Sequence, residues 1–171
     1  MSYGILLLRL VVGIAFVGHG TQKLFGWFGG YGPKGTGGFF ASKGYRAPVL
    51  MAVAAGVSEA AGGTLLALGF ATPLAAAMLA TVMINAIASV TFKKSFMLGS
   101  EIEITYLTLA VSLAAIGPGR FSIDRAIGWD DNISGVWWGV AVLGAALVVS
   151  ILTLTLGRTR LVSEQEPAVQ T

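Results

Sequence analysis

The sequence predicts an all-α integral membrane protein, in which a four-helix core is followed by a fifth, C-terminal transmembrane helix. The composition indicates this class, because 55% of the 171 residues are hydrophobic and only 11% are charged, whereas a soluble domain has about 25% charged residues. Several apolar stretches also approach the roughly 20 residues that cross a hydrocarbon core of about 30 Å. Since unpaired backbone groups are costly in lipid, we expect each stretch to be helical.

Five apolar segments follow one another along the chain. They cover residues 4–20, 49–70, 74–92, 102–117 and 136–156. The first segment contains Arg9 and continues to Phe25. Glycine and proline in Gly69–Pro73 predict a tight turn between the second and third segments. The fourth segment is short, so it either just crosses the membrane, re-enters it, or is completed by residues before Glu101.

Residues 26–48 form a glycine-rich stretch with a high density of aromatic side chains. Because Trp and Tyr prefer the membrane–water interface, we interpret this stretch as a loop on the membrane surface. A lid over a cavity is the alternative interpretation.

The residue types exclude several kinds of site within this chain. It has no cysteine, which removes disulfides, dithiol redox chemistry and cysteine-ligated iron–sulfur clusters. The single histidine, His19, excludes haem ligation by two histidines of one chain, and no residues have the spacing of a metal site. The net charge is +3, and membrane proteins often collect Lys and Arg in their cytoplasmic loops. The basic charge therefore does not indicate nucleic acid as a partner.

The distribution of Lys and Arg predicts the orientation in the membrane. With five crossings, one side holds Lys23, Lys34, Lys43, Arg46, Lys93, Lys94, Arg158 and Arg160, and the other holds Arg120 and Arg125. Because basic residues concentrate in cytoplasmic loops, the first side is predicted to be cytoplasmic. The N-terminus is then outside and the C-terminus cytoplasmic. If the fourth segment does not cross, Arg120 and Arg125 join the cytoplasmic side and the C-terminal tail lies outside.

Polar side chains within the apolar segments form the candidate site, since such groups usually face the interior of a helix bundle. The candidates for an intramembrane polar pocket are Arg9, His19, Gln22, Lys23, Glu59 and Asn85, and those for its entrance are Glu101, Glu103 and Tyr106. The most economical arrangement pairs Glu59 with Arg9 or His19. Two structural interpretations of these residues stay open. Arg9 and Glu59 form an ion pair that only fixes helix register, and His19 is an interfacial residue that is hydrogen-bonded to a carbonyl.

Helical spacing gives the first four segments one polar face each. Thr81, Asn85 and Ser89 share a face of the third, and Glu101, Thr105, Thr108 and Ser112 share a face of the fourth. The fifth segment has only scattered hydroxyl groups, which predicts a position at the periphery. On the second segment the small residues Ala52, Gly56, Ala60 and Gly63 allow another helix to approach closely. Asp124 is expected to cap a helix or to pair with Arg120 or Arg125.

Several of these residues together resemble a known family. The first helix carries Arg9-Leu10, Gly13, Phe16, His19-Gly20 and Gln22–Trp27, followed by Gly37–Phe40, Glu59 with Gly62-Gly63, and Gly117–Arg120 with Ser122 and Asp124. This pattern is similar to the DoxX family over roughly residues 5–127. The resemblance implies a four-helix membrane domain over 1–127. An additional transmembrane helix within 128–157 is then a departure from the family, and 158–171 is expected to be a polar, disordered tail.

The resemblance also implies a role. Members of the family include the small membrane subunit of a thiosulfate:quinone oxidoreductase, and others are linked to complexes that handle oxidative and thiol stress. We therefore expect a subunit of an oxidoreductase or redox-stress system in a bacterial inner membrane. Its partners would be lipid and other subunits of a redox complex. The alternatives are a non-catalytic anchor or assembly protein, which could self-associate, and, with less support, a small transporter.

A quinone is the candidate ligand that this resemblance implies. In such a site His19 or Asn85 could donate a hydrogen bond to a quinone carbonyl, and Glu59 could shuttle a proton. The aromatic residues at 25–28 could cover the quinone ring. Neither haem nor an iron–sulfur cluster is expected.

Overall fold

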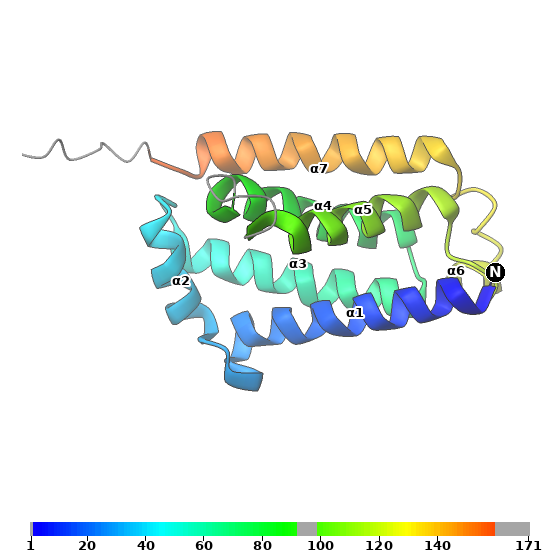
Figure 1. Ribbon diagram of the computed structural model, residues 1–171, viewed down its shortest axis with the longest axis horizontal. Coiled ribbons are helices and arrows are strands. Elements are labelled where there is room, and N and C mark those ends of the chain that lie inside the picture. The colour runs from blue at the N-terminus through cyan, green and yellow to red at the C-terminus, as the bar shows by residue number, and fades with distance from the viewer. Residues whose placement is uncertain (1, 92–98, 160–171) are drawn as a thin grey trace, which may run out of the picture.

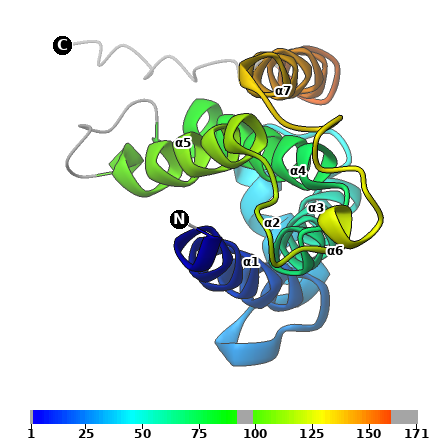
Figure 2. The same cartoon turned by 90° about the vertical axis from the view of Figure 1, so that its right-hand side faces the viewer.

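The computed structural model describes residues 2–91 and 99–159, and it is a bundle of long helices (Figures 1 and 2). The long helices are α1 (Ser2–Phe25), α3 (Pro48–Leu68), α4 (Thr72–Ala86), α5 (Glu101–Ile116) and α7 (Val136–Leu156). The shorter elements are a 3₁₀ turn (Trp27–Gly29), α2 (Gly32–Ser42), a π-helical continuation of α4 (Ile87–Thr91) and α6 (Ile123–Ala126). The described part of the chain contains no strand, so the predicted all-helical membrane fold is confirmed.

Each predicted apolar segment corresponds to one long helix. Four of these are long and apolar enough to cross a membrane: α1, α3, α4 with part of its continuation (Thr72–Ser89), and α7. The last residue of the predicted third segment, Phe92, lies outside the described residues, as do Lys93, Lys94, Arg160 and the rest of the tail.

Helix α5, the short fourth segment, runs between the two ends of the bundle (Figure 1). At one end its Ala115 carbonyl accepts a hydrogen bond from the Gly135 amide, 2.9 Å away, just before α7. At the other end Ile102 and Glu103 face residues of α2 across a shared pocket. Its 16 residues span about 24 Å, somewhat less than the bilayer core. Within the bundle, the fourth segment therefore runs from one end to the other as a single helix.

The described basic residues separate between the two ends of the bundle. Lys23, Lys34, Lys43, Arg46 and Arg158 lie on elements at the α2 end, whereas Arg120 and Arg125 lie at the end that holds the N-terminus and α6 (Figure 1). This grouping is the one that five crossings predict.

Helices α1 and α3 pack at very short range through small residues. A Cβ atom added to Gly20 would lie 2.5 Å from the Ala60 nitrogen, and one added to Gly13 would lie 2.5 Å from the Gly63 carbonyl oxygen. The small-residue stripe of the second segment is therefore occupied within the chain, by α1. It no longer argues for association between copies.

The turn between α3 and α4 has the predicted glycine and proline chemistry. Gly69 adopts a left-handed conformation (φ 63°) at the end of α3, and Pro73 lies in the first turn of α4. The buried Asp124 carboxylate then accepts hydrogen bonds from the Ala71 amide (2.8 Å), the Thr72 amide (3.0 Å) and the Thr72 hydroxyl (2.8 Å). Asp124 is thus a cap, but of a helix distant in sequence.

Arg125 forms an ion pair with an acidic residue other than Asp124. Its guanidinium pairs with Asp130 at 2.6 Å, and neither Arg120 nor Arg125 forms an ion pair with Asp124 in the described residues. Of the two alternatives expected from the sequence, Asp124 therefore takes the cap and not the ion pair, because its carboxylate turns inward to the start of α4.

The prediction of a surface loop over residues 26–48 is wrong in its local structure, because α2 occupies much of the stretch. Glycine-rich sequence has little helix propensity of its own. Here packing supports the helix: Gly37 is buried against α3, where an added Cβ would lie 2.8 Å from a Val49 methyl carbon.

Helices α1 and α7 lie at opposite edges of the bundle, with α3, α4 and α5 between them (Figure 2). Helix α7 packs on α4 and α5 and leaves most of its surface exposed, in agreement with a peripheral position. The apolar core, which includes Phe16, Leu66, Leu79 and Leu113, lies where the five long helices face one another.

A candidate ligand pocket at the α2 end of the bundle

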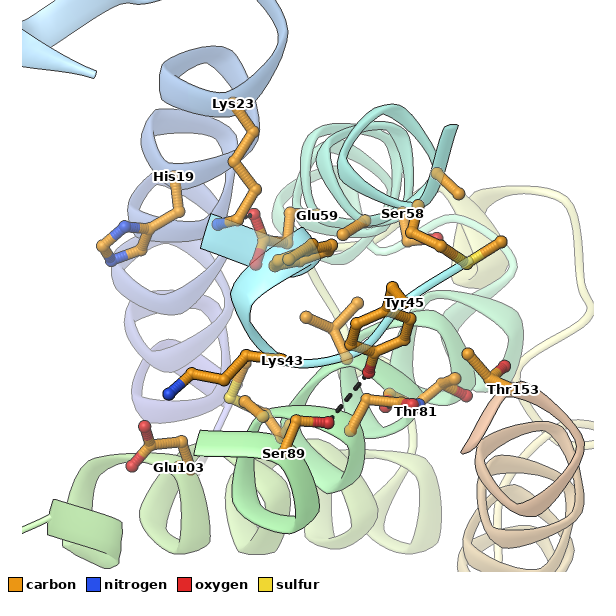
Figure 3. Close-up of a pocket in the computed structure, with 18 of the residues that line it drawn as sticks. His19, Lys23, Lys43, Tyr45, Ser58, Glu59, Thr81, Ser89, Glu103 and Thr153 are labelled. Atoms are coloured by element: carbon orange, nitrogen blue, oxygen red, sulfur yellow. Dashed lines mark hydrogen bonds and ion pairs between the residues drawn. The ribbon is translucent and has the colours of Figure 1, made fainter. Parts of the chain in front are cut away.

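A cavity of about 490 Å³ lies between the helices toward the α2 end. Six helices contribute to its wall: α1, α2, α3, α4, α5 and α7 (Figure 3). Most of the surface of the wall is apolar, although about half of the lining side chains carry a polar or charged group. The polar and charged ones are His19, Lys23, Lys43, Tyr45, Ser58, Glu59, Thr81, Asn85, Ser89, Glu103, Tyr106 and Thr153. The structure thus gathers His19, Lys23, Glu59, Asn85, Glu103 and Tyr106 from the sequence-based candidates.

A partly buried ion pair forms one wall of this cavity. Glu59 on α3 is only 3% exposed, and its Oε2 lies 2.6 Å from the Nζ atom of Lys23 on α1. Figure 3 shows the two side chains directed toward each other. The sequence was right that Glu59 needs a basic partner but wrong about which one, since neither Arg9 nor His19 forms the pair.

Arg9 lies elsewhere, toward the other end of α1, and does not line the cavity. Its guanidinium, 1% exposed, donates to the backbone carbonyls of Leu66 (3.1 Å), Ala67 (3.2 Å), Phe121 (2.7 Å) and Pro118. These contacts tie α1 to the end of α3 and to the segment before α6. Arg9 is therefore a structural residue in this fold, not a member of the pocket.

His19 lies at the rim of the pocket and is oriented by Gln22. The Gln22 side-chain nitrogen donates to the Phe28 carbonyl at 3.3 Å, which leaves its Oε1 atom facing His19 Nδ1 at 3.2 Å. Because that amide oxygen can only accept, Nδ1 is the nitrogen that carries the hydrogen in the neutral ring. Gln22 itself does not line the cavity.

Asn85 connects the pocket wall to α7. Its Nδ2 atom donates to the Thr81 carbonyl and to the Ser150 hydroxyl, both at 2.9 Å. Since α7 also contributes Val149 and Thr153 to the lining, the peripheral helix completes the pocket. The hydroxyl groups of α7 were the only signal for this in the sequence, and they were too scattered to indicate it.

The predicted entrance residues divide into two groups. Glu103 and Tyr106 line the cavity, and the Tyr106 ring packs edge-on against Phe16, with 5.1 Å between centroids. Glu101, two residues before Glu103 on α5, is exposed and outside the cavity. Helices α1 and α5 otherwise pack on different neighbours, α1 on α3 and α5 on α4 and α7.

The end of α2 and the turn that follows form a wall that the sequence did not identify as part of the site. Phe39, Phe40, Lys43 and Tyr45 line the cavity, and the Tyr45 hydroxyl lies 2.8 Å from the Ser89 hydroxyl (Figure 3). The high aromatic content of residues 26–48 was the available signal, and the lid interpretation is the one that anticipated this placement.

The C-terminal end of α7 holds this wall in position. The guanidinium of Arg158 lies 5.5 Å from the centre of the Tyr45 ring, and its Nε atom donates to the Lys43 carbonyl at 2.9 Å. Backbone hydrogen bonds join Arg46 to Gly157 (2.9 Å) and Thr159 to Gly44 (2.8 Å). By contrast Phe25, Trp27 and Phe28 are largely exposed and do not line the cavity.

Within residues 2–91 and 99–159, no group of three or more His, Cys, Asp or Glu side chains could hold a metal ion. The charged groups of the pocket are two carboxylates, Glu59 and Glu103, and two ammonium groups, Lys23 and Lys43. The arrangement can therefore bind an organic molecule in a mainly apolar space and offer it both hydrogen-bond donors and hydrogen-bond acceptors.

Fold and pocket together define a helical multi-pass membrane protein with a cavity between its helices. The chain belongs to the DoxX family, whose model matches residues 4–92. A relative in Bacillus subtilis (strain 168), named "Putative oxidoreductase CatD", is 35% identical over 121 residues, which cover 71% of this chain and 84% of the relative. No solved structure gives a significant match. Family and relative support a role for this membrane protein in association with an oxidoreductase.

Proposed function

We propose that this protein is the membrane-embedded subunit of an oxidoreductase and that its pocket binds a quinone. The observation that carries the proposal is the cavity of about 490 Å³, whose surface is mainly apolar and whose wall includes the Glu59–Lys23 ion pair. Ligand sites in proteins typically have volumes of about 300–1,000 Å³ and few, well-placed polar groups. A quinone is a lipid-soluble ring with carbonyl oxygens, so it suits a mainly apolar pocket that contains hydrogen-bond donors.

The residues of the pocket fit such a ring. The rings of Phe16, Phe39, Phe40 and Tyr106 line the cavity and can pack on an aromatic ligand. These rings take the place of residues 25–28, which the sequence suggested for this role. The ammonium groups of Lys23 and Lys43 are the strongest donors for a quinone carbonyl.

Two other donors expected from the sequence are already engaged. Both hydrogens of the Asn85 amide have acceptors, Thr81 and Ser150. The neutral His19 ring directs its one N–H to Gln22. The donors for an oxidised quinone are therefore the two lysines, together with hydroxyl groups that line the cavity, such as those of Ser58 and Tyr106.

A bound quinone would supply the redox chemistry, since it accepts two electrons and two protons. Glu59 is the group placed to hold a proton inside the bundle, because its carboxylate reaches the cavity wall and pairs with Lys23 near the α2 end. Electrons must come from a partner protein or a substrate, because the chain has no cysteine and therefore no thiol relay of its own.

We further propose that the protein resides in a bacterial inner membrane with the α2 end in the cytoplasm. The support is the unequal distribution of basic residues, five at the α2 end against two at the α6 end among the described residues, together with the positive-inside rule.

Binding to the cavity is tested by filling it. The Ala86→Phe variant places a ring where a small residue lines the pocket, and Ala145→Phe makes the same change on an exposed position of α7. Wild-type protein in lipid nanodiscs should bind decylubiquinone, Ala86→Phe should lose that binding, and Ala145→Phe should keep it. Absence of binding to the wild type, or equal binding to all three proteins, would contradict the proposal.

Proton transfer is tested separately with Glu59→Gln. This variant keeps the shape of the side chain and can still accept a hydrogen bond from Lys23, but it cannot release a proton. Quinone-coupled turnover of membranes that carry the variant should be abolished, with the helical circular dichroism spectrum unchanged. Unaltered turnover would rule out Glu59 as the proton carrier.

A further inference from the structure

Building on the proposed quinone site, we propose that the pocket binds the reduced, hydroxyl-bearing quinol more tightly than the quinone, through Asn85 Oδ1 and Glu103 Oε2. Both oxygen atoms are buried, and neither has a hydrogen-bond partner in the described structure. Both residues line the cavity. A ligand that donates hydrogen bonds would therefore supply the donors that these two oxygen atoms lack.

The orientation of the Asn85 amide follows from its neighbours. The Thr81 carbonyl can only accept a hydrogen bond, so the atom 2.9 Å from it must be the Asn85 nitrogen. The same nitrogen reaches the Ser150 hydroxyl. This leaves Oδ1 as a fixed acceptor, because turning the amide over would break its bond to Thr81.

Glu103 supplies the second acceptor. It lies in the first turn of α5, near the positive end of the helix dipole. None of the described ion pairs involves Glu103. Its Oε2 atom is consequently a buried acceptor without a donor.

His19 adds a third acceptor at the rim. Because Gln22 fixes the hydrogen on Nδ1, the Nε2 atom of the neutral ring carries a lone pair. Figure 3 shows the side chains of His19, Lys43 and Glu103 toward the same side of the pocket. A hydroxyl group entering from that side finds acceptors on both α1 and α5.

The preference follows from the cost of buried, unpaired acceptors. Both oxygens are already shielded from water, and a quinone carbonyl only accepts hydrogen bonds, so a bound quinone leaves them unpaired. A quinol hydroxyl can donate to each of them and still accept from a lysine. If the quinol binds tenfold more tightly, the midpoint potential of the bound two-electron couple rises by about 30 mV, which favours electron transfer into the quinone.

The experiment compares three ligands with the same ring and tail in the same anaerobic nanodiscs: decylubiquinol, decylubiquinone, and the dimethyl ether of the quinol, which has no hydroxyl hydrogens. Dissociation constants are measured by titration calorimetry. We expect the wild type to bind the quinol about tenfold more tightly than either other ligand, as one charge-assisted hydrogen bond provides.

The Glu103→Gln variant tests the acceptor itself, and Glu101→Gln is its matched control on an exposed position of the same helix turn. The quinol-to-quinone affinity ratio should fall about fivefold to tenfold in Glu103→Gln and stay unchanged in Glu101→Gln. Taking this ratio within each protein cancels differences in lipid partitioning between the ligands.

The possible outcomes separate this inference from the proposed function. If the quinone binds as tightly as the quinol, or the dimethyl ether does, the inferred preference is wrong while the quinone site stands. A ratio that Glu103→Gln does not change rules out Glu103 as the acceptor. If none of the three ligands binds, the proposed function fails and the inference fails with it.

Discussion

The replacement of Arg9 by methionine tests how much one buried side chain contributes to the stability of the bundle. Methionine keeps most of the side-chain volume but removes every donor. The carbonyls of Ala67, Pro118 and Phe121 accept no other hydrogen bond in the described structure, while that of Leu66 also accepts from a backbone amide. At about 1–2 kcal/mol for each of the three orphaned carbonyls, the free energy of unfolding should fall by about 3–6 kcal/mol.

The assay is unfolding by SDS in mixed micelles, followed by circular dichroism. Arg9→Lys should lie between the wild type and Arg9→Met, because an ammonium group keeps the charge but not the planar arrangement of donors. The control is Arg125→Met, which removes an exposed ion pair with Asp130 at the same end of the bundle and should leave the midpoint unchanged. The reasoning would be refuted if Arg9→Met unfolded at the same SDS fraction as Arg125→Met.

Three further predictions use the same cysteine-free chain. Gly20→Ala should lower stability by about 1–3 kcal/mol, because the added methyl group meets the backbone of α3, whereas Gly18→Ala, with nothing within 4 Å, should be neutral or slightly stabilising in the same assay. Asp124→Asn should cost about 1–2 kcal/mol, since the cap of α4 loses its charge and one of its acceptors; an unchanged unfolding midpoint would contradict the capping role. In intact cells a membrane-impermeant maleimide should label the Arg125→Cys variant but reach Lys34→Cys only after lysis; the reverse pattern would invert the proposed orientation.

The positions of the helices could be predicted from local sequence because hydrophobicity and helix-ending residues are local properties. The fifth segment, 136–156, coincides with α7, and Gly69 and Pro73 bracket the turn before α4. Helix α2 could not be predicted in this way. Its glycine-rich sequence has low helix propensity, and contacts with α3 rather than local preferences stabilise it.

The composition of the site could be predicted only in part, and for a different reason. Polar residues in an apolar span are conspicuous, so His19, Glu59 and Asn85 could be selected from the sequence alone. Tyr45 and Lys43 lie outside the apolar segments, and their role at the pocket depends on the backbone pairing between residues 44–46 and 157–159. This pairing joins segments that lie far apart in the sequence, so local sequence patterns do not predict it.

The partner of Glu59 shows which features the sequence determines and which only the tertiary structure determines. The sequence by itself determined that a carboxylate lies within an apolar helix and needs a basic partner, and helical spacing placed Arg9 and His19 among the candidates. The register between α1 and α3 determines that Lys23 is the residue that pairs with Glu59. Glycine contacts set that register and place Arg9 opposite Ala67, which is about 12 Å along the axis from Glu59 at 1.5 Å per residue. Hydrophobicity fixes which segments enter the membrane, but only close packing between two helices fixes how far one is shifted along the other, and that shift decides which charges meet.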